Sequence, residues 1–521
     1  MRVDHIFHVP KAAQARFPLA FPLQWLNDTT VLLIALAAGL VLIELGGQRD
    51  SLPVLIAGVL VFGLLAYVQP RLALLYVPLT APLYLIPINI PGIRYGQDAS
   101  FLLPIHELIL LITFLAFIIQ HALQVSSRLA FASGRLSRSR PLRWTELFQK
   151  LRYWAPASLF LIAGLLGIIP AIAPAPALRE LRWLILEPLL FYALLHYYLL
   201  DPSQGRQSRR YAMQLIGSML LAGSLVALIS IVQFGGYDLS TLFGQKQCTC
   251  DSVMTYGNAR RVSSVYGSPN NLALLLERVW PLAALLLYAH ATRRRRRTEY
   301  LVVFGVVAAL CLIGILLSFS RGALFASSLA VVLLWMLQRS GQPRIHTDLR
   351  KPWSIALLLA VLGIAVIFLV VRNDSLMQGS SVRILLWKEA LGYIRLHPYG
   401  IGLDQFLYYH MPTSGRSLID PSLVDTTVAQ VSHPHNLLLD TWLRIGPIGV
   451  IAFAWLLIRF FRATQLAVQQ GRSSPILAAV SLALLVLLLH GLVDQFYFVP
   501  DLALAFWMLI ALGQWALRSP E

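Results

Sequence analysis

A histidine and an asparagine stand immediately before a very apolar stretch of the sequence. His435-Asn436 is followed, nine residues later, by Gly446-Pro447-Ile448-Gly449. A nearby helix N-terminus disfavours an imidazolium ion, which keeps a histidine ring neutral and able to accept a proton. The two glycines would let a neighbouring helix approach closely. The pattern predicts that His435 is a general base at the first turn of an apolar helix, supported by Asn436.

Three arginines fall on the same side of the membrane in the topology given below. They are Arg261, Arg321 in a Ser-Arg-Gly turn, and Arg383 at the start of an amphipathic stretch. A guanidinium group matches phosphate geometry through paired hydrogen bonds. An arginine at the membrane edge is costly unless it is paired or faces water. The set therefore predicts an anionic, phosphate-bearing ligand. Two alternatives stay open: Arg321 reaches the interface as an anchor, or Arg383 pairs with Glu389 or with lipid headgroups.

Three more polar residues could support this site. His433 lies close to His435, although Pro434 between them is expected to keep the two rings apart. His490 and Asp494 end the next apolar stretch one helical turn apart. Those two residues either face the same cavity or form a buried pair that holds helices together.

Two loop segments should shape the site. Asn270 or Asn271 can cap the helix that follows Arg261, and the exposed amides of such a helix favour an anion. Gly400 and Gly402 would let the outer loop fold tightly back towards the membrane. No pair of carboxylates has the spacing of a metal site, so we expect no metal and no cofactor.

The elements that must position these residues are membrane helices. The 521 residues are 57% hydrophobic and 13% charged, whereas a soluble domain carries about 25% charged residues. We therefore expect an all-α polytopic membrane protein with about twelve to fourteen transmembrane helices, forming one membrane domain over residues 1–521. The predicted spans are 29–47, 52–69, 72–90, 101–123, 155–174, 181–200, 212–235, 270–291, 299–319, 322–339, 353–372, 435–458, 475–494 and 500–517.

Several smaller features complete this expectation. Prolines interrupt the span at 72–90, and no cleavable signal peptide is visible in residues 1–28. Cys311 should be buried within a helix, whereas the oxidation state of Cys248 and Cys250, in a loop, stays open.

The net charge of +18 fits orientation in a membrane better than nucleic-acid binding. The basic loops all fall on one side if both termini are cytoplasmic. Two long connections, 236–269 and 373–434, then lie on the extracytoplasmic face, and the second contains a predicted amphipathic helix at 382–396. Long ordered loops tend to be functional. We therefore expect an extracytoplasmic, partly helical cap that carries part of the active site.

With these motifs in order, residues 210–460 resemble the O-antigen ligase and O-antigen polymerase superfamily. The most specific match is His435, Asn436, Gly446 and Gly449; the Ser-Arg-Gly turn at Arg321 and the segment from Arg261 to Asn270 are also similar to family motifs. Such proteins are integral-membrane glycosyltransferases of the GT-C type. They use glycans carried on undecaprenyl pyrophosphate at the outer face of the cytoplasmic membrane, without a nucleotide sugar or divalent metal.

The resemblance implies roles for individual residues. Arg261 and Arg321, with Arg383 as a third, would bind the donor pyrophosphate, and His435 would be the catalytic base. The acceptor would be lipid A–core in a ligase or another lipid-linked repeat in a polymerase, which the high helix count favours; a protein acceptor is a third alternative. The rival from another class is a lipid-linked oligosaccharide flippase, which needs polar groups along a central cavity and not on one face.

Overall fold

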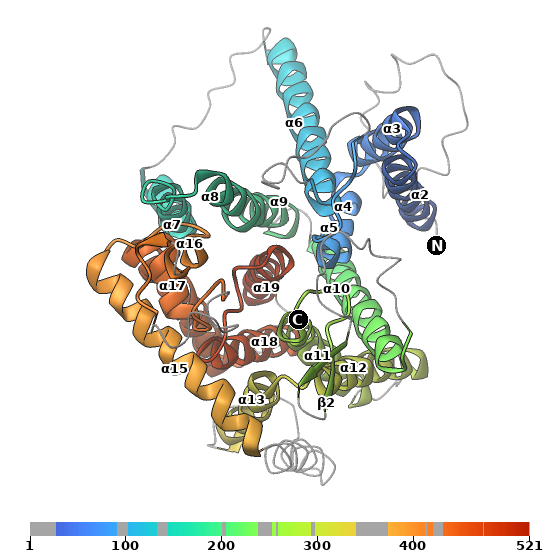
Figure 1. Ribbon diagram of the computed structural model, residues 1–521. Helices are drawn as coiled ribbons and strands as arrows, with labels where there is room; N and C mark the ends of the chain where they lie inside the picture. The colour runs from blue at the N-terminus through green and yellow to red at the C-terminus, as the bar shows by residue number, and fades with distance from the viewer. Residues whose placement is uncertain are drawn as a thin grey trace. The chain divides into compact units, whose positions relative to one another are not determined.

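The computed structural model describes eleven stretches of the chain, and the polytopic all-α class is confirmed over them (Figure 1). The described residues are 28–90, 103–132, 144–200, 205–237, 253–256, 259–292, 297–339, 373–411, 414–419, 431–472 and 474–519. The chain divides into two compact units. The residues discussed as a site all belong to the second unit.

The first unit contains a helical hairpin and most of a long helix. Helix α2 (Thr29–Gln48) packs against α3 (Leu52–Val68), and α4 (Pro70–Ala73) follows; α6 spans Ile105–Ala132. A Cβ atom at Gly46 would lie 2.3 Å from the backbone nitrogen of Leu55. Glycine is therefore required for the close approach of the two hairpin helices.

The span predicted at 72–90 is wrong. The chain instead forms α4, α5 (Tyr76–Thr80) and a 3-10 turn η2 (Ala81–Leu83). Pro78 and Pro82 interrupt this region, and proline removes a backbone donor and clashes with the preceding turn of a helix.

The second unit is a bundle of helices with one small hairpin of strands. Its elements are α7 (Trp144–Leu166), α8 (Pro174–Glu180), a π-helical turn η3 (Leu181–Leu186), α9 (Glu187–Leu200), α10 (Gly205–Phe234), β1 (Val253–Tyr256), β2 (Ala259–Val262), α11 (Pro269–Ala291), α12 (Thr298–Ser318), α13 (Arg321–Arg339), α15 (Asn373–Leu396), α16 (Phe406–His410), α17 (Leu437–Gln469), α18 (Pro475–Gly491) and α19 (Pro500–Arg518). Helix α11 packs against α12 and α18, α17 packs against α7, α19 packs against α9, and α13 packs against α18.

Among the described residues, eight helical segments are long and apolar enough to cross a membrane. They are Thr29–Gln48, Ile105–Leu123, Pro174–Leu200, Gln207–Phe234, Pro269–Ala291, Thr298–Ser318, Leu437–Gln469 and Pro500–Arg518. Shorter apolar helices occur at Leu52–Val68, Tyr153–Leu166 and Pro475–Gly491. The predicted span at 353–372 lies outside the described residues, as do Cys248 and Cys250. Cys311 is buried within α12, as predicted.

Helix α17 is two helical segments joined by a kink. Gly446 has a left-handed φ of 70° and is followed by Pro447. The segment from Pro447 to Gln469 is by itself long enough to cross a hydrocarbon core, which needs about 20 residues. The first segment, Leu437–Ile445, is a separate short helix. His435 lies immediately before Asn436, the N-cap of α17, and therefore just outside the first turn in which it was predicted.

The region after α13 builds its own small core. The helix predicted at 382–396 is present as the second half of α15, and a cluster of buried side chains joins it to α16 and α17. Its members are Leu386, Ala390, Tyr393, Ile401, Phe406, Tyr409 and Leu443. Beneath it, the imidazole of His410 lies 2.8 Å from a carboxylate oxygen of Glu389, and both side chains are buried. This core fixes α15, which carries Arg383, against α17.

Candidate functional site

The backbone at His435 is held in an unusual conformation. Its φ of 51° lies in the left-handed region, which costs a non-glycine residue about 1–3 kcal/mol unless the surroundings hold it. Asn436 is the N-cap of α17, and its Oδ1 accepts hydrogen bonds from the amides of Leu438 and Leu439. Its Nδ2 also donates to the carbonyl of Leu492 at 2.9 Å. Asn436 thus ties the start of α17 to the segment that follows α18.

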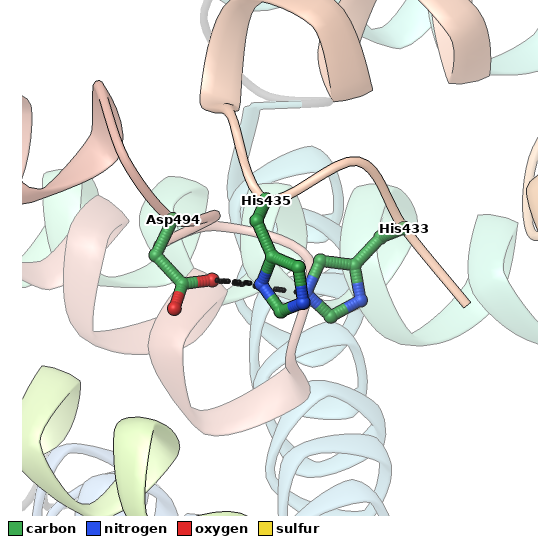
Figure 2. Close-up of side chains that lie close together, drawn as sticks. All are labelled: His433, His435 and Asp494. Carbon is green, nitrogen blue, oxygen red and sulfur yellow. Dashed lines mark hydrogen bonds and ion pairs between the residues drawn. The ribbon is translucent and has the colours of Figure 1, made fainter. Parts of the chain in front are cut away.

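That segment places a buried carboxylate against the two histidines. Nδ1 of His435 lies 3.0 Å from Oδ1 of Asp494, and Nε2 of His433 lies 3.7 Å from the same oxygen (Figure 2). The centroids of the two imidazole rings are 4.2 Å apart. The expectation that Pro434 separates the rings is therefore wrong, because the turn at Pro434 brings both rings to one carboxylate.

Burial and charge give the members of this cluster different electrostatic states. The Asp494 side chain is 4% exposed, whereas those of His435 and His433 are 24% and 20% exposed. Burial alone would raise the pKa of Asp494, but the charge and hydrogen bonds of the two histidines hold it well below its usual range. The pKa of His433 is lowered by burial and by the charge of His435. The site thus holds a persistent negative charge beneath two imidazoles.

The second oxygen of Asp494 binds residues from two other helices. Nδ2 of Asn270, on α11, donates to Oδ2 at 2.8 Å. A guanidinium nitrogen of Arg383, on α15, lies 3.7 Å from the same Oδ2. The alternative of an Arg383–Glu389 pair is thus not observed, since Glu389 binds His410. Asp494 joins α11, α15 and the start of α17.

The predicted capping by Asn270 or Asn271 is also corrected. Ser268 is the N-cap of α11, and its hydroxyl accepts from the amide of Asn270. Pro269 occupies the first helical position, which proline favours because its fixed φ suits a helix start. The side chain of Asn270 therefore takes no part in capping, and it binds Asp494 and Arg261 instead.

Arg261 connects Asn270 to the backbone just before the Ser-Arg-Gly turn. Its Nη2 donates to Oδ1 of Asn270 at 3.1 Å, and its Nε donates to the carbonyl of Ser318 at 2.9 Å. Ser318 ends α12, and Phe319 turns the chain with a left-handed φ of 49°. Arg321 then begins α13. Arg261 and Arg321 thus lie on backbone segments that contact each other, whereas Arg383 lies near Asp494 itself.

His490 forms a separate buried pair with Glu277. Its Nδ1 lies 2.8 Å from Oε2 of Glu277 on α11, and both side chains are fully buried. A Cβ atom at Gly322 would lie only 2.4 Å from Nε2 of His490. The His490 ring therefore packs directly beneath the start of α13. The alternative of a direct His490–Asp494 side-chain pair is therefore not observed, because His490 binds Glu277 while Asp494 binds His435 and Asn270.

Two residues near the site were given no role from sequence. Nε1 of Trp387 donates to the carbonyl of His435 at 3.4 Å. Trp387 lies one helical turn after Arg383, a spacing that puts both on one face of α15. Glu277 is a carboxylate inside an apolar helix, and such residues mark functional or paired positions. Both signals are visible in the sequence, but neither identifies the partner.

His433, His435 and Asp494 could also hold a metal ion by donor type. One ligand atom from each lies within 4.8 Å of the others. However, Oδ1 of Asp494 already faces two imidazoles, and Oδ2 already accepts from Asn270 and lies near Arg383. The positive charge of Arg383, close to this carboxylate, opposes a divalent cation. With Arg261 bound to Asn270 on the same carboxylate, two arginines stand against one carboxylate, and this excess of positive charge would favour an anionic ligand.

The arrangement can perform one kind of chemistry well. An imidazole oriented by a buried carboxylate can remove a proton from a hydroxyl group. Guanidinium groups nearby can bind and neutralise a phosphate leaving group. Both functions depend on side chains from strand β2, from helices α11, α13 and α15, from the start of α17 and from the α18–α19 connection.

Comparison with known proteins adds one positive finding. No curated protein matches the chain. Residues 306–454 match the family model described as O-antigen ligase. The matched segment contains Arg321, Arg383 and His435, whereas Arg261 and Asp494 lie outside it. Over this segment, the chain is similar to the O-antigen ligase family.

Proposed function

We propose that the protein is a metal-independent, inverting glycosyltransferase. It would move a glycan from undecaprenyl pyrophosphate to an acceptor hydroxyl at the outer face of the cytoplasmic membrane. The family match and the apolar helices support a ligase- or polymerase-type enzyme in a membrane. The observation that carries the finer proposal is the His435–Asp494 pair, with Arg383 on the same carboxylate and Arg261 one side chain further away.

The hydrogen bond to Asp494 assigns the atoms of the proposed base. With its Nδ1–H donated to Asp494, the neutral His435 ring keeps Nε2 as its proton acceptor. Nε2 takes the proton from the acceptor hydroxyl as that oxygen bonds to the anomeric carbon. The bond between the anomeric carbon and the pyrophosphate oxygen breaks on the opposite face, which inverts the configuration. Asp494 stabilises the imidazolium that forms.

The arginines act on the leaving group. Negative charge grows on the pyrophosphate as the glycosidic bond breaks, and prepositioned positive groups stabilise that charge. Arg261, Arg321 and Arg383 belong to separate elements, β2, α13 and α15. They can therefore surround a diphosphate from several directions. No step in this mechanism needs a metal ion or a cofactor.

Several features of the cellular setting belong to the same proposal. The basic loops would lie in the cytoplasm with both termini, and the site would open to the extracytoplasmic side. The acceptor would be lipid A–core or another lipid-linked repeat. A flippase is disfavoured because the polar cluster is built from helix ends and their connections, namely the starts of α11, α13 and α17 and the α18–α19 connection.

A reconstituted assay tests the proposal. Purified protein in lipid nanodiscs would receive a synthetic undecaprenyl-pyrophosphate glycan with either lipid A–core or a second lipid-linked repeat. We expect a glycosylated product and released undecaprenyl pyrophosphate with one acceptor, and no product from His435→Ala. His290→Ala is a matched control, because His290 lies at the opposite end of α11 from Asn270.

Two results would overturn the proposal. One is full activity in His435→Ala. The other is movement of the lipid-linked glycan between leaflets of proteoliposomes without any bond formation, which would indicate a transporter.

A further inference from the structure

The kink of α17 leaves one backbone carbonyl without its normal partner. In a regular helix the carbonyl of Leu443 would accept from the amide of residue 447. That residue is Pro447, which has no amide hydrogen. The carbonyl of Leu443 instead accepts from the amides of Ile401 and Gly402, at 2.7 and 3.1 Å. The segment around Gly400 thus replaces the missing intrahelical hydrogen bond.

This docking requires glycine on both sides of the contact. A Cβ atom at Gly400 would lie 2.8 Å from the carbonyl oxygens of Trp442 and Leu443, and Gly400 has a φ of 96°. A Cβ atom at Gly446 would lie 2.6 Å from the carbonyl oxygen of Tyr399. The predicted close approach at Gly446 is therefore real, but the partner is this loop and not a neighbouring helix.

The same loop also reaches the end of α7. The amide of Leu403 donates to the carbonyl of Gly167 at 3.0 Å, and a Cβ atom at Gly402 would lie 3.0 Å from that same oxygen. A Cβ atom at Gly167 would in turn lie 2.7 Å from the carbonyl of Arg444. Three backbone segments therefore meet with almost no side chain between them. We call the meeting of Gly167, Gly400, Gly402 and Gly446 the glycine junction.

Side chains hold the short helix Leu437–Ile445 from its other faces. Arg444 is buried and binds Asp440 on its own helix and Glu180 on α8. Nε1 of Trp442 donates to the carbonyl of Pro398 at 2.9 Å. The short helix is thus fixed at its C-terminal end by the loop, and at its N-terminal end it carries Asn436 and His435.

We propose that the glycine junction is a positioning device for His435: its backbone contacts fix the short helix Leu437–Ile445 and so set the imidazole against the acceptor hydroxyl. Gly400 and Gly402 are positioning residues that act through the kink. The inference rests on the proposed role of His435 as base. It also explains why the left-handed backbone at His435 is tolerated, because both ends of the short helix are held.

Alanine substitutions test this separation of roles. Gly400→Ala and Gly402→Ala should lower kcat by about 100-fold, the usual cost of a misplacement of roughly 1 Å. The affinity for undecaprenyl pyrophosphate should fall much less than kcat, because Arg261 and Arg321 lie on elements outside the junction and only Arg383, on α15, lies on a helix that packs against it. Gly415→Ala is the matched control: Gly415 also has a positive φ, 66°, but nothing lies within 4 Å of its Cβ position. Its kcat should stay near the wild-type value.

The glycine variants could fail to fold, so a milder variant and a measurement on the wild-type protein test the same contacts. Trp442→Phe removes one hydrogen bond to the loop without adding an atom and should lower kcat in the same direction. In wild-type protein, hydrogen exchange at the amides of Ile401 and Gly402 should be slow, since both are bonded to Leu443.

The outcomes distinguish the two proposals. If Gly402→Ala and Trp442→Phe match Gly415→Ala in kcat, or if those two amides exchange freely, the positioning role is wrong while His435 can still be the base. If His435→Ala retains full activity, the proposed function fails whatever the glycine variants show.

Discussion

Nδ1 of His435 lies 3.0 Å from Oδ1 of Asp494, although 59 residues separate them in the sequence. The carboxylate is buried and the imidazole is partly exposed. The contact therefore orients the ring through Nδ1 and leaves Nε2 outside this hydrogen bond. It also makes Asp494 the common partner of a proposed base and a proposed pyrophosphate ligand, Arg383.

The first prediction concerns this pair. Asp494→Asn should lower kcat by about 10²–10⁴-fold, because the ring loses its orientation and the imidazolium loses its counter-charge. His435→Ala combined with Asp494→Asn should lose little more than His435→Ala alone, since residues that act as one unit are not additive. The measurement is the kcat of the wild type, the two single variants and the double variant in the nanodisc assay.

A matched control uses another buried aspartate. Asp501, in α19, binds the hydroxyl of Tyr266 and not His435. The effects of Asp501→Asn and His435→Ala should therefore multiply. If the effects of Asp494→Asn and His435→Ala also multiply, the two residues do not work as a unit.

Arg321 provides the second prediction. Arg321→Ala should weaken donor binding by roughly 10- to 100-fold, since a hydrogen bond to a charged group is worth about 1.5–3 kcal/mol. Arg321→Lys should recover only part of this affinity, because an ammonium group cannot reproduce the planar guanidinium fork. Donor affinity and kcat would be measured for both variants. Wild-type affinity in both would leave Arg321 as an interfacial anchor.

The third prediction follows from the contact beneath Arg321. Gly322→Ala places a methyl group 2.4 Å from Nε2 of His490, and that ring is held by Glu277. The start of α13 must shift, so donor affinity should fall without any loss of charge. Gly305→Ala, in α12, is the control because nothing lies within 4 Å of its Cβ position. Equal donor affinities in the two alanine variants would contradict the argument.

Most members of the candidate site can be predicted from residue type and spacing. Arginine near an apolar segment is costly, so Arg261, Arg321 and Arg383 were conspicuous in the sequence, and His435 was conspicuous beside its asparagine. The apolar runs similarly predicted long helices such as α2, α3, α6, α10, α11, α12 and α19, because a run of about 20 apolar residues has one stable form in lipid. The predicted span at 72–90 was wrong, and the one at 353–372 lies outside the described residues.

The partners of these residues could not be predicted. Asn270 and Asp494 are 224 residues apart, and no local pattern connects them. The choice of Ser268 as helix cap depended on backbone angles that several polar residues can adopt. The partner at Gly446 was misjudged for a related reason: a glycine indicates close approach but does not say what approaches.

The fourth prediction concerns pH. The fold lowers the pKa of His433, so the unfolded chain binds a proton more readily below about pH 6.5. This residue should therefore reduce stability as the pH falls from 7 to 5. Replacing it by glutamine removes the titration, so His433→Gln should gain thermal stability relative to the wild type over that range. Melting temperatures at pH 5, 6 and 7 test this. A constant difference would show that His433 titrates equally in both states.

The last prediction is that activity survives removal of divalent metals. His433, His435 and Asp494 have the donor types of a zinc site. However, a metal on Asp494 would have to displace the hydrogen bond from Asn270 or sit beside Arg383. Protein treated with EDTA and shown by elemental analysis to be metal-free should keep its kcat. Added Zn²⁺ should at most inhibit, because it would occupy the imidazole that must accept the proton. Loss of turnover with EDTA, restored by Mg²⁺ or Mn²⁺, would show that a cation and not the arginines neutralises the leaving group.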